Sequence, residues 1–332
     1  MKKIKLLIFF IVFTSIGCFQ VSSDDSFNIW VKKFKTKAIQ EGVSIKTVNL
    51  VMDKAIFLPK VIEYDRYQPE FYEDTKTYVS KRTSKDRVRK GVKIYKNNKL
   101  LINIVDKEFD VEKELLLALM GIETNYGTYL GKMDIISSLA TLSFDKRRSE
   151  FFTSELITVL KLIDRNKIDK NILFGSWAGA FGNFQFMPST ISKYAIDYNK
   201  NTIIELKAVD DSFASAANYM KSIGWKKNEP CFYKVELRDN VPKKLLNTSA
   251  RNIKNKKKYK YLKKYLKFDN NLIGDNEIVA LVTPDTDIIE NNSSLSPAYI
   301  IFSNYEKILN WNRSLRFAIA VCTLKNEFVN EL

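Results

Sequence analysis

The spacing of apolar positions predicts a mainly helical chain before residue 229. Residues 24–55 are predicted to form two helices, with Ser44 as the cap of the second, because apolar side chains of the first recur on one helical face. These side chains are Phe27, Trp30, Val31, Phe34 and Ala38. The strongly charged stretch 71–93 is predicted to be a further helix with a solvated basic face.

The stretch from Lys113 to Glu123 differs from the other helical stretches because it has almost no polar face. Its apolar positions are Leu115, Leu116, Leu117, Ala118, Leu119, Met120 and Ile122. A helix of this kind is buried on all sides, and Gly127 suits the left-handed turn that would end it. Further helices are expected at 149–164, 189–196, 211–223 and 312–329.

After residue 230 the pattern changes from the helical period to alternation. Strands are predicted around Tyr233–Leu237 and in two short β-branched or aromatic runs at 277–283 and 298–303. The basic stretch 243–267 lies between them and also holds aromatic residues. A solvated amphipathic helix is the commoner structure for such a stretch, and binding of a polymer by its Lys and aromatic side chains is the alternative.

The N-terminus predicts export. A short basic segment precedes the apolar run Leu6–Ile16, which has the order of a secretory signal and is too short for a bilayer-spanning helix of ~20 residues. Residues 1–17 are therefore assigned to a signal peptide. Cys18 stands as in the box at which lipoproteins are acylated, although Ser15 replaces the usual Leu. The expected location is periplasmic, with an outer-membrane lipoprotein and a cleaved soluble form as alternatives.

The chain of 332 residues carries a formal net charge of +16, from 54 Lys and Arg against 38 Asp and Glu. Such a charge favours polyanionic partners, which include nucleic acid, anionic lipid head groups and a cell-wall polymer with peptide carboxylates. The export signal disfavours nucleic acid. A general abundance of Lys with no ligand behind it is the alternative.

The composition also excludes several kinds of catalytic and metal sites. The chain has no histidine, which excludes Ser-His-Asp and Cys-His nucleophiles, HExxH zinc sites and imidazole proton transfer. Its three cysteines, at positions 18, 231 and 322, offer neither a disulfide framework nor a CxxC metal site. An acid or base must be a carboxylate, Lys, Tyr or Cys, and no cofactor or metal is expected.

Glu123 is the candidate acid because it stands where the apolar helix ends. A carboxylate at such a position is poorly hydrated, and desolvation raises the pKa of a carboxyl group toward neutrality, as a general acid requires. A helix-end Glu that bonds to a neighbouring amide is the structural alternative.

Four ordered motifs carry a family resemblance. They are Gly121-Ile-Glu-Thr-Asn-Tyr-Gly127, Ser138-Leu-Ala-Thr-Leu-Ser-Phe144, Gly175-Ser-Trp-Ala-Gly-Ala-Phe-Gly-Asn-Phe-Gln-Phe-Met-Pro-Ser189 and Ala217-Asn-Tyr-Met-Lys-Ser-Ile-Gly-Trp225. In order and spacing the chain resembles the membrane-bound lytic murein transglycosylase B family, from about Tyr64 through Ser314.

The resemblance implies an α+β, mainly helical, lysozyme-like fold and a peptidoglycan lytic transglycosylase. Glu123 would be the sole acid/base in cleavage of the β-1,4 bond between N-acetylmuramic acid and N-acetylglucosamine, with a 1,6-anhydromuramoyl product. A hydrolytic muramidase on the same fold and a non-catalytic peptidoglycan-binding protein are the alternatives. No second acid is evident. The acids considered are Asp134, Asp145, Glu150 and Glu155.

The resemblance also implies the groove residues. Ser176, Gln185 and Asn312 would bind the glycan strand of peptidoglycan, and Phe184, Phe186 and Trp311 would stack on sugar faces. A place in the hydrophobic core is the alternative for Phe186. Tyr126 would line the groove or pack under it. A monomer is expected, with no nucleic acid as partner.

One departure from the family lies in the loop 197–208, where relatives often carry an EF-hand-like cation site. The oxygen ligands that remain are Asp197, Asn199 and Asn201. Thr202 replaces the Gly of the tight turn and Ala208 replaces the bidentate Glu, so no tight calcium site is expected.

The expected organisation has four parts after the signal peptide. They are an N-terminal helical region (24–105), a lysozyme-like catalytic core (106–228), a small β-rich subdomain (229–304) and a C-terminal helix packing back on the core (305–332).

Overall fold

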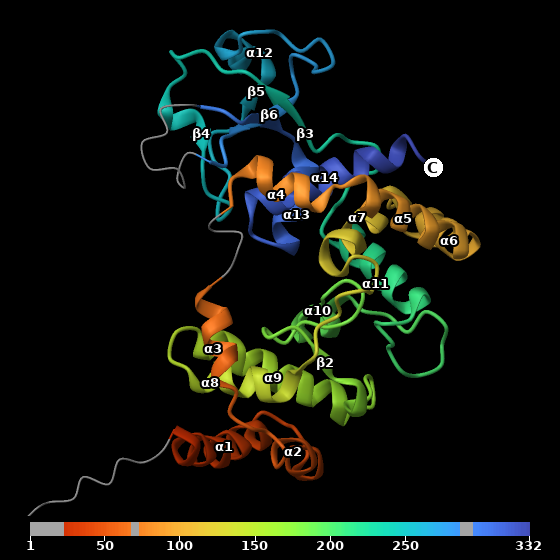
Figure 1. The fold of residues 1–332 in the computed structure, drawn as a ribbon, viewed down its shortest axis with the longest axis vertical. Coiled ribbons are helices and arrows are strands. Elements are labelled where there is room, and N and C mark those ends of the chain that lie inside the picture. Colours follow the sequence, from red (N-terminus) through yellow and green to blue (C-terminus); the bar gives the residue numbers. More distant parts are fainter. Residues whose placement is uncertain (1–22, 68–72, 286–294) are drawn as a thin grey trace, which may run out of the picture.

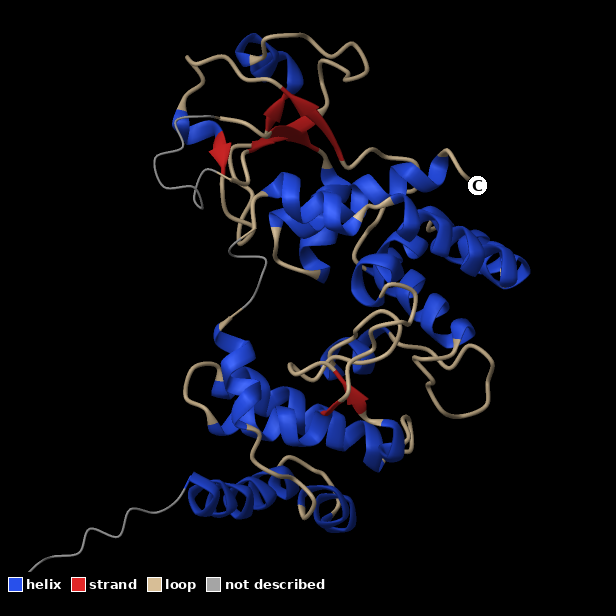
Figure 2. Ribbon diagram, in the orientation of Figure 1, coloured by secondary structure: helices blue, strands red, loops and turns tan. Residues whose placement is uncertain are grey.

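The computed structural model describes residues 23–67, 73–285 and 295–332. The predicted signal peptide 1–17 and Cys18 lie outside these ranges. The described chain is mainly helical, and its five-stranded sheet lies at one end of the molecule (Figure 2). Within these ranges, none of the helices combines the length and the apolar character needed to cross a membrane.

The N-terminal helices lie at the end opposite this sheet (Figure 1). They are α1 (Ser23–Gln40), α2 (Ile45–Met52) and α3 (Pro59–Arg66), and they pack on α8 (Ile135–Phe144) and α9 (Ser149–Asp164). The two helices predicted in 24–55 are confirmed, and the Ser44 side chain accepts a hydrogen bond from Thr47 N at the start of α2.

The charged stretch predicted as one helix is two helices. Residues Thr75–Arg82 form α4 and Lys85–Asn97 form α5. The break has a local cause, because the Ser84 side chain accepts a hydrogen bond from Arg87 N and so starts a new helix. Two further helices follow, α6 (Lys99–Phe109) and α7 (Lys113–Thr124).

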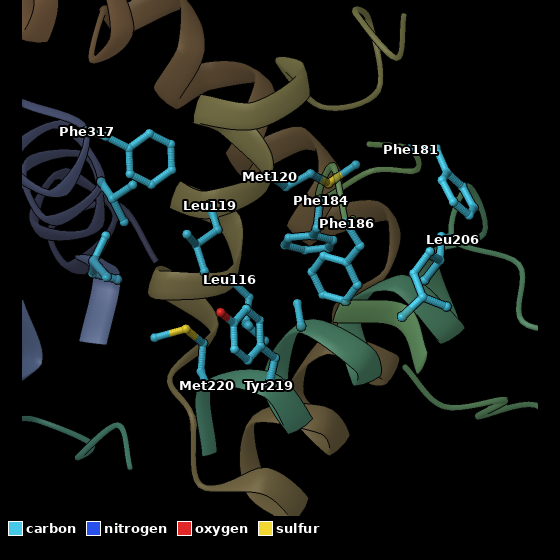
Figure 3. Packing of buried hydrophobic residues seen from close by; sticks show 14 of the residues in the cluster. Leu116, Leu119, Met120, Phe181, Phe184, Phe186, Leu206, Tyr219, Met220 and Phe317 are labelled. Atoms are coloured by element: carbon cyan, nitrogen blue, oxygen red, sulfur yellow. The ribbon is translucent and has the colours of Figure 1, made fainter. Parts of the chain in front are cut away.

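Helix α7 is the centre of the core, as its lack of a polar face predicts. Leu115, Leu116 and Leu119 have no exposed surface. The helix packs against α5, α6, α11 (Val209–Ser222) and, most extensively, α14 (Leu315–Val329). Figure 3 shows its Leu119 and Met120 between Phe317 of α14 and the aromatic side chains on the other side. The last turn of α7 is thereby held in place.

The β-rich part is one mixed sheet with the strand order β3 (Phe232–Val235), β7 (Ala298–Ile301), β6 (Ile278–Val282) and β4 (Leu246–Asn247). Strand β5 (Lys257–Lys258) also pairs with β6. The pairing of β4 with β6 is parallel and the other pairings are antiparallel. A separate two-stranded pair, β1 (Met133–Asp134) and β2 (Phe174–Gly175), lies in the helical part. The three predicted strand regions are confirmed.

The basic stretch 243–267 is not the amphipathic helix that was the commoner expectation. It consists of β4, β5, the four-residue helix α12 (Tyr259–Leu262) and short 3-10 turns. Tyr259 and Leu262 are buried in a second hydrophobic cluster with residues of β6 and β7. The stretch follows the sheet because its apolar residues are anchored there, at intervals too irregular for one helical face.

The cysteines were expected to offer no disulfide framework, and the structure holds a single disulfide bond that this expectation did not foresee. Cys231, just before β3, is bonded to Cys322 in α14, 91 residues further along the chain. Cys231 and Cys322 form one long-range disulfide bond, which is not a framework of several bonds. Cys18 lies outside the described residues. In the chain-entropy account, closing a loop of that length stabilises the folded state by roughly 4.6 kcal/mol. The bond ties the sheet to the helix that backs α7.

Candidate active site

Glu123 lies in the last turn of α7, immediately before a tight reversal of the chain. Asn125, Tyr126 and Gly127 all have left-handed backbones, with φ of 48°, 60° and 79°. The Thr124 hydroxyl holds the reversal, since it donates to Asn183 O (2.8 Å) and accepts from Gly127 N (3.1 Å). Two non-glycine residues in this conformation cost about 1–3 kcal/mol each, so the surrounding contacts must stabilise the turn.

The carboxylate of Glu123 is half-buried and accepts a hydrogen bond from the indole of Trp311. The distance from Trp311 Nε1 to Glu123 Oε1 is 2.9 Å. Trp311 is the last residue of α13 (Ser303–Trp311). An indole N–H can only donate. The carboxylate therefore has a fixed donor supplied by a distant part of the chain.

Aromatic rings hold the indole of Trp311. The ring of Tyr219 stacks on it with centroids 5.0 Å apart and planes at 22°. Phe186 and Phe184 contact it at steeper angles, at 5.2 Å and 6.2 Å. Tyr219 is fixed in turn, because its hydroxyl donates to Asn310 O at 3.0 Å.

The structure corrects the role expected for Phe184 and Phe186. Each is only 2% exposed, so neither offers a ring face to a sugar. Figure 3 shows both side chains packed between α7, at Met120, and Tyr219 of α11. These two apolar rings pack against the Trp311 indole and so hold it in place. Trp311 itself is partly exposed and remains a candidate for contact with a ligand.

Ser176 and Gln185 lie on the loop that follows β2, and both are partly exposed. Ser176 Oγ accepts from Ala180 N at 3.0 Å, which closes the first turn of the loop. Gln185 has a left-handed backbone (φ 48°), and its Nε2 donates to Gly182 O (3.0 Å) and Leu130 O (3.3 Å). The second of these bonds ties the loop to the segment after the reversal at Glu123.

Gly182 shows why this loop needs glycine. Its φ is +82°, and a Cβ there would lie 2.5 Å from Leu206 Cβ. The glycine thus permits close packing of protein on protein. Asn312 caps the end of α13 next to Trp311, with its N–H bonded to Ile308 O, and its side chain is partly exposed.

The phenol hydroxyl of Tyr126 packs under the turn, although the residue as a whole is partly exposed. A Cβ at Gly91 of α5 or Gly121 of α7 would lie 2.6 Å or 2.5 Å from Tyr126 Oη, so the phenol occupies the space between these helices. The hydroxyl is buried and has no hydrogen-bond partner among the described residues. Burial raises the pKa of Tyr126.

The other acids considered from sequence have structural partners. Asp134 caps α8 by accepting from Ser137 N at 2.7 Å, and Asp145 pairs with Arg66 at 3.0 Å. Glu155 is buried and accepts from Ser189 N and Oγ at 2.9 and 2.6 Å. Glu150 is exposed on α9.

The loop 197–208 closes on itself through its own oxygens. Asp197 accepts from Asn201 N (3.0 Å) and Thr202 N (2.7 Å). Behind the loop, the buried Asp211 accepts from Tyr198 N and Glu205 N, both at 2.8 Å, and burial raises the pKa of Asp211. Within the described ranges, no group of three or more His, Cys, Asp or Glu residues is placed to hold a metal ion.

Sequence reasoning missed Tyr219 and Thr124 as parts of the site. Both stand inside the quoted motifs, 217–225 and 121–127. Their positions in those motifs were a signal that they matter. Their roles, stacking on Trp311 and fixing the reversal after Glu123, depend on contacts between distant segments.

Comparison with known proteins gives one family and several relatives. Residues 26–326 match the family model described as the transglycosylase SLT domain. The membrane-bound lytic murein transglycosylase B of Escherichia coli (strain K12) is 37% identical over 153 residues, which are 46% of this chain and 42% of that protein. The matched region therefore spans less than half the length of that relative.

Solved structures match over most of the chain. SltB3 from Pseudomonas aeruginosa, in complex with NAG-anhNAM-pentapeptide, has a TM-score of 0.79 at 28% identity, covering 91% of this chain and 79% of that one. The Escherichia coli lytic transglycosylase Slt35, in complex with calcium, has a TM-score of 0.74 at 25% identity, covering 94% and 95%. These matches confirm the expected fold class.

Replacing Tyr126 tests whether its buried hydroxyl contributes to stability. We expect Tyr126→Phe to leave the free energy of unfolding unchanged or to increase it by about 1 kcal/mol, because a buried hydroxyl without a partner is removed. Denaturant unfolding monitored by circular dichroism measures this. A loss of more than about 1 kcal/mol would mean that the hydroxyl has a stabilising partner, against the arrangement described here.

Proposed function

The chain belongs to the transglycosylase SLT domain family, and on this basis we propose that it is a peptidoglycan lytic transglycosylase. It cleaves the β-1,4 bond between N-acetylmuramic acid and N-acetylglucosamine with Glu123 as the acid/base. The observation that carries the proposal is the half-buried carboxylate at the end of an apolar helix, held by the Trp311 indole. Its relative SltB3 has been crystallised with NAG-NAM-pentapeptide and NAG-anhNAM-pentapeptide, which supports the substrate class.

In the proposed mechanism one carboxyl group acts twice. Glu123 first donates its proton to the glycosidic oxygen, and the bond from that oxygen to C1 of the muramoyl residue breaks. The resulting carboxylate then takes the proton of the muramoyl O6 hydroxyl as O6 bonds to C1. The product is a 1,6-anhydromuramoyl end, Glu123 is protonated again, and no water is consumed. Because O6 belongs to the same sugar as C1, its effective concentration is high.

A single acid suffices in this mechanism, whereas ordinary glycosidases need a second carboxylate about 5–9.5 Å from the first. The partners of Asp134, Asp145 and Glu155 support the single-acid account, because each of these carboxylates is engaged in capping, an ion pair or anchoring of α10 (Pro188–Tyr194). The role of Trp311 is to orient the Glu123 carboxylate. Its indole N–H can donate a hydrogen bond but cannot accept one.

The glycan strand is proposed to lie over the exposed parts of the site. Ser176, Gln185 and Asn312 present polar side chains there, and the partly exposed edge of Trp311 can contact a sugar. The protein acts in the periplasm after export, and acylation of Cys18 would anchor it to the outer membrane. No cofactor takes part in the mechanism.

The first test is digestion of purified sacculi by wild type and by Glu123→Gln, with mass spectrometry of the released fragments. We expect wild type to release fragments with anhydro ends, and the variant to be slower by at least about 100-fold, because general acid catalysis contributes at least that factor. Glu150→Gln is the matched control, since Glu150 is exposed on α9 and should leave the rate unchanged.

Three outcomes of that digestion would contradict the proposal. Fragments with reducing ends would identify a hydrolytic muramidase. Equal release by wild type and Glu123→Gln would remove Glu123 from the mechanism. Binding without any release would indicate a non-catalytic protein.

The second test concerns the hydrogen bond to Glu123. Trp311→Phe keeps an aromatic ring in the stack with Tyr219 but removes the indole N–H. We expect kcat on sacculi to fall by roughly tenfold, the equivalent of a hydrogen bond to a charged group at about 1.5 kcal/mol. Trp30→Phe makes the same ring change in α1 and should leave kcat near wild type. An unchanged kcat for Trp311→Phe would show that the indole does not position the acid.

A further inference from the structure

The positive charge of the chain is concentrated in one segment. Of the 54 Lys and Arg residues, 11 lie in residues 243–267, where there is no acidic residue, and three lie in the first 17 residues. The other 40 are nearly balanced by the 38 Asp and Glu. A general abundance of Lys would not produce this distribution, so the charge is a property of a particular place in the fold.

The charged side chains of this segment are available to a partner. Ten of the 11 are exposed, and Lys263 is half-buried. Three form ion pairs, Lys256 with Glu306, Lys263 with Asp275 and Lys267 with Glu236. The other eight have no ion pair with any residue that the structure describes. We call these the basic face: Lys243, Lys244, Arg251, Lys254, Lys257, Lys258, Lys260 and Lys264.

The basic face is presented on a fixed support at the end of the molecule opposite α1 and α2, where β4, β5 and α12 lie (Figure 1). Tyr259 and Leu262 of α12 are each 1% exposed. Tyr259 Oη also donates to Asp269 Oδ1 at 2.5 Å. These two side chains anchor α12 in the subdomain, whereas Tyr261 of the same helix is 57% exposed beside the lysines.

A hollow beside α13 lies next to the basic segment 243–267. This hollow of about 330 Å³ between the β-rich part and α13 is lined by Lys256, Lys307, Glu306 and Asn310. Asn310 directly precedes Trp311, which donates to Glu123. A polymer that passes over the site can therefore reach the basic face along α13.

We infer that the basic face binds the carboxylates of the peptides attached to the glycan strand that is cleaved. The inference rests on the proposed function. The sugar backbone of N-acetylated residues supplies no dense charge, whereas each attached peptide ends in a carboxylate, so the polymer as a whole is polyanionic. Such binding increases the time that the enzyme spends on the polymer and depends on salt.

The test measures binding of the full chain carrying Glu123→Gln, which leaves the polymer intact, to purified sacculi by co-sedimentation. In this background Lys254, Lys257, Lys258 and Lys264 are changed together to Gln. The matched control changes Lys32, Lys33, Lys37 and Lys60 to Gln, which are exposed on α1 and α3 and remove the same charge. We expect about tenfold weaker binding for the first set and less than about twofold for the control.

Two further measurements identify the chemical group that the basic face binds. Sacculi whose carboxyl groups have been converted to neutral amides should bind the unsubstituted basic face about tenfold more weakly, and the difference between the two sets of variants should disappear above about 200 mM salt. Vesicles containing phosphatidylglycerol should not reproduce the difference between the variants.

The inference is overturned if both sets of variants bind sacculi equally, if amidation has no effect, or if only the vesicles distinguish the variants. The last result would assign the basic face to a lipid surface. The proposed function is judged separately, by anhydro-ended fragments released when Glu123 is intact. Failure of one therefore does not imply failure of the other.

Discussion

The hydrogen bond from Trp311 to Glu123 joins residues 188 positions apart, and the geometry of the site depends on it. The carboxylate comes from the end of α7 and the indole from the end of α13. Both helices pack on α14, which keeps the two ends in register. The disulfide between Cys231 and Cys322 fastens α14 to the start of the sheet. The β-rich part thus takes part in positioning the acid, although it holds none of the reacting groups.

The backbone just after Glu123 is strained in this arrangement. One short reversal holds the Thr124 hydroxyl, three successive left-handed residues and a phenol hydroxyl that has no hydrogen-bond partner in the described part of the chain. Such strain persists only where the surroundings determine the conformation. Here the apolar body of α7 and the bond from Thr124 to Asn183 O do so. The acid is therefore held by packing from behind and by one donor from the side.

Local patterns predicted much of the fold. The apolar period located α1, α7, α9 and α14, and the motifs identified the family, which the comparisons confirm. The helix break at Ser84 was not predicted. The pattern of charged residues does not show whether the Ser84 side chain caps a new helix or the first helix continues. The disulfide and the course of residues 243–267 depend on contacts across the whole chain.

The site was predicted only in part for the same reason. Glu123 was identified from its place at the end of an apolar helix together with the motif 121–127, but its donor Trp311 was assigned a stacking role. Phe184 and Phe186 were taken as ligand contacts because aromatic residues near a site suit both purposes. Only their 2% exposure shows that they support the indole instead. Sequence indicates which residues belong to a site more readily than it indicates which way they face.

Cleavage of the glycan by one carboxyl group, without water, can be distinguished from hydrolysis by isotope labelling. Sacculi are digested in water enriched in heavy oxygen, and the muramoyl ends are measured by mass spectrometry. We expect anhydro ends without the label, because O6 of the sugar replaces water at C1. Label incorporated at C1 during cleavage would show that water is the nucleophile and would contradict the account.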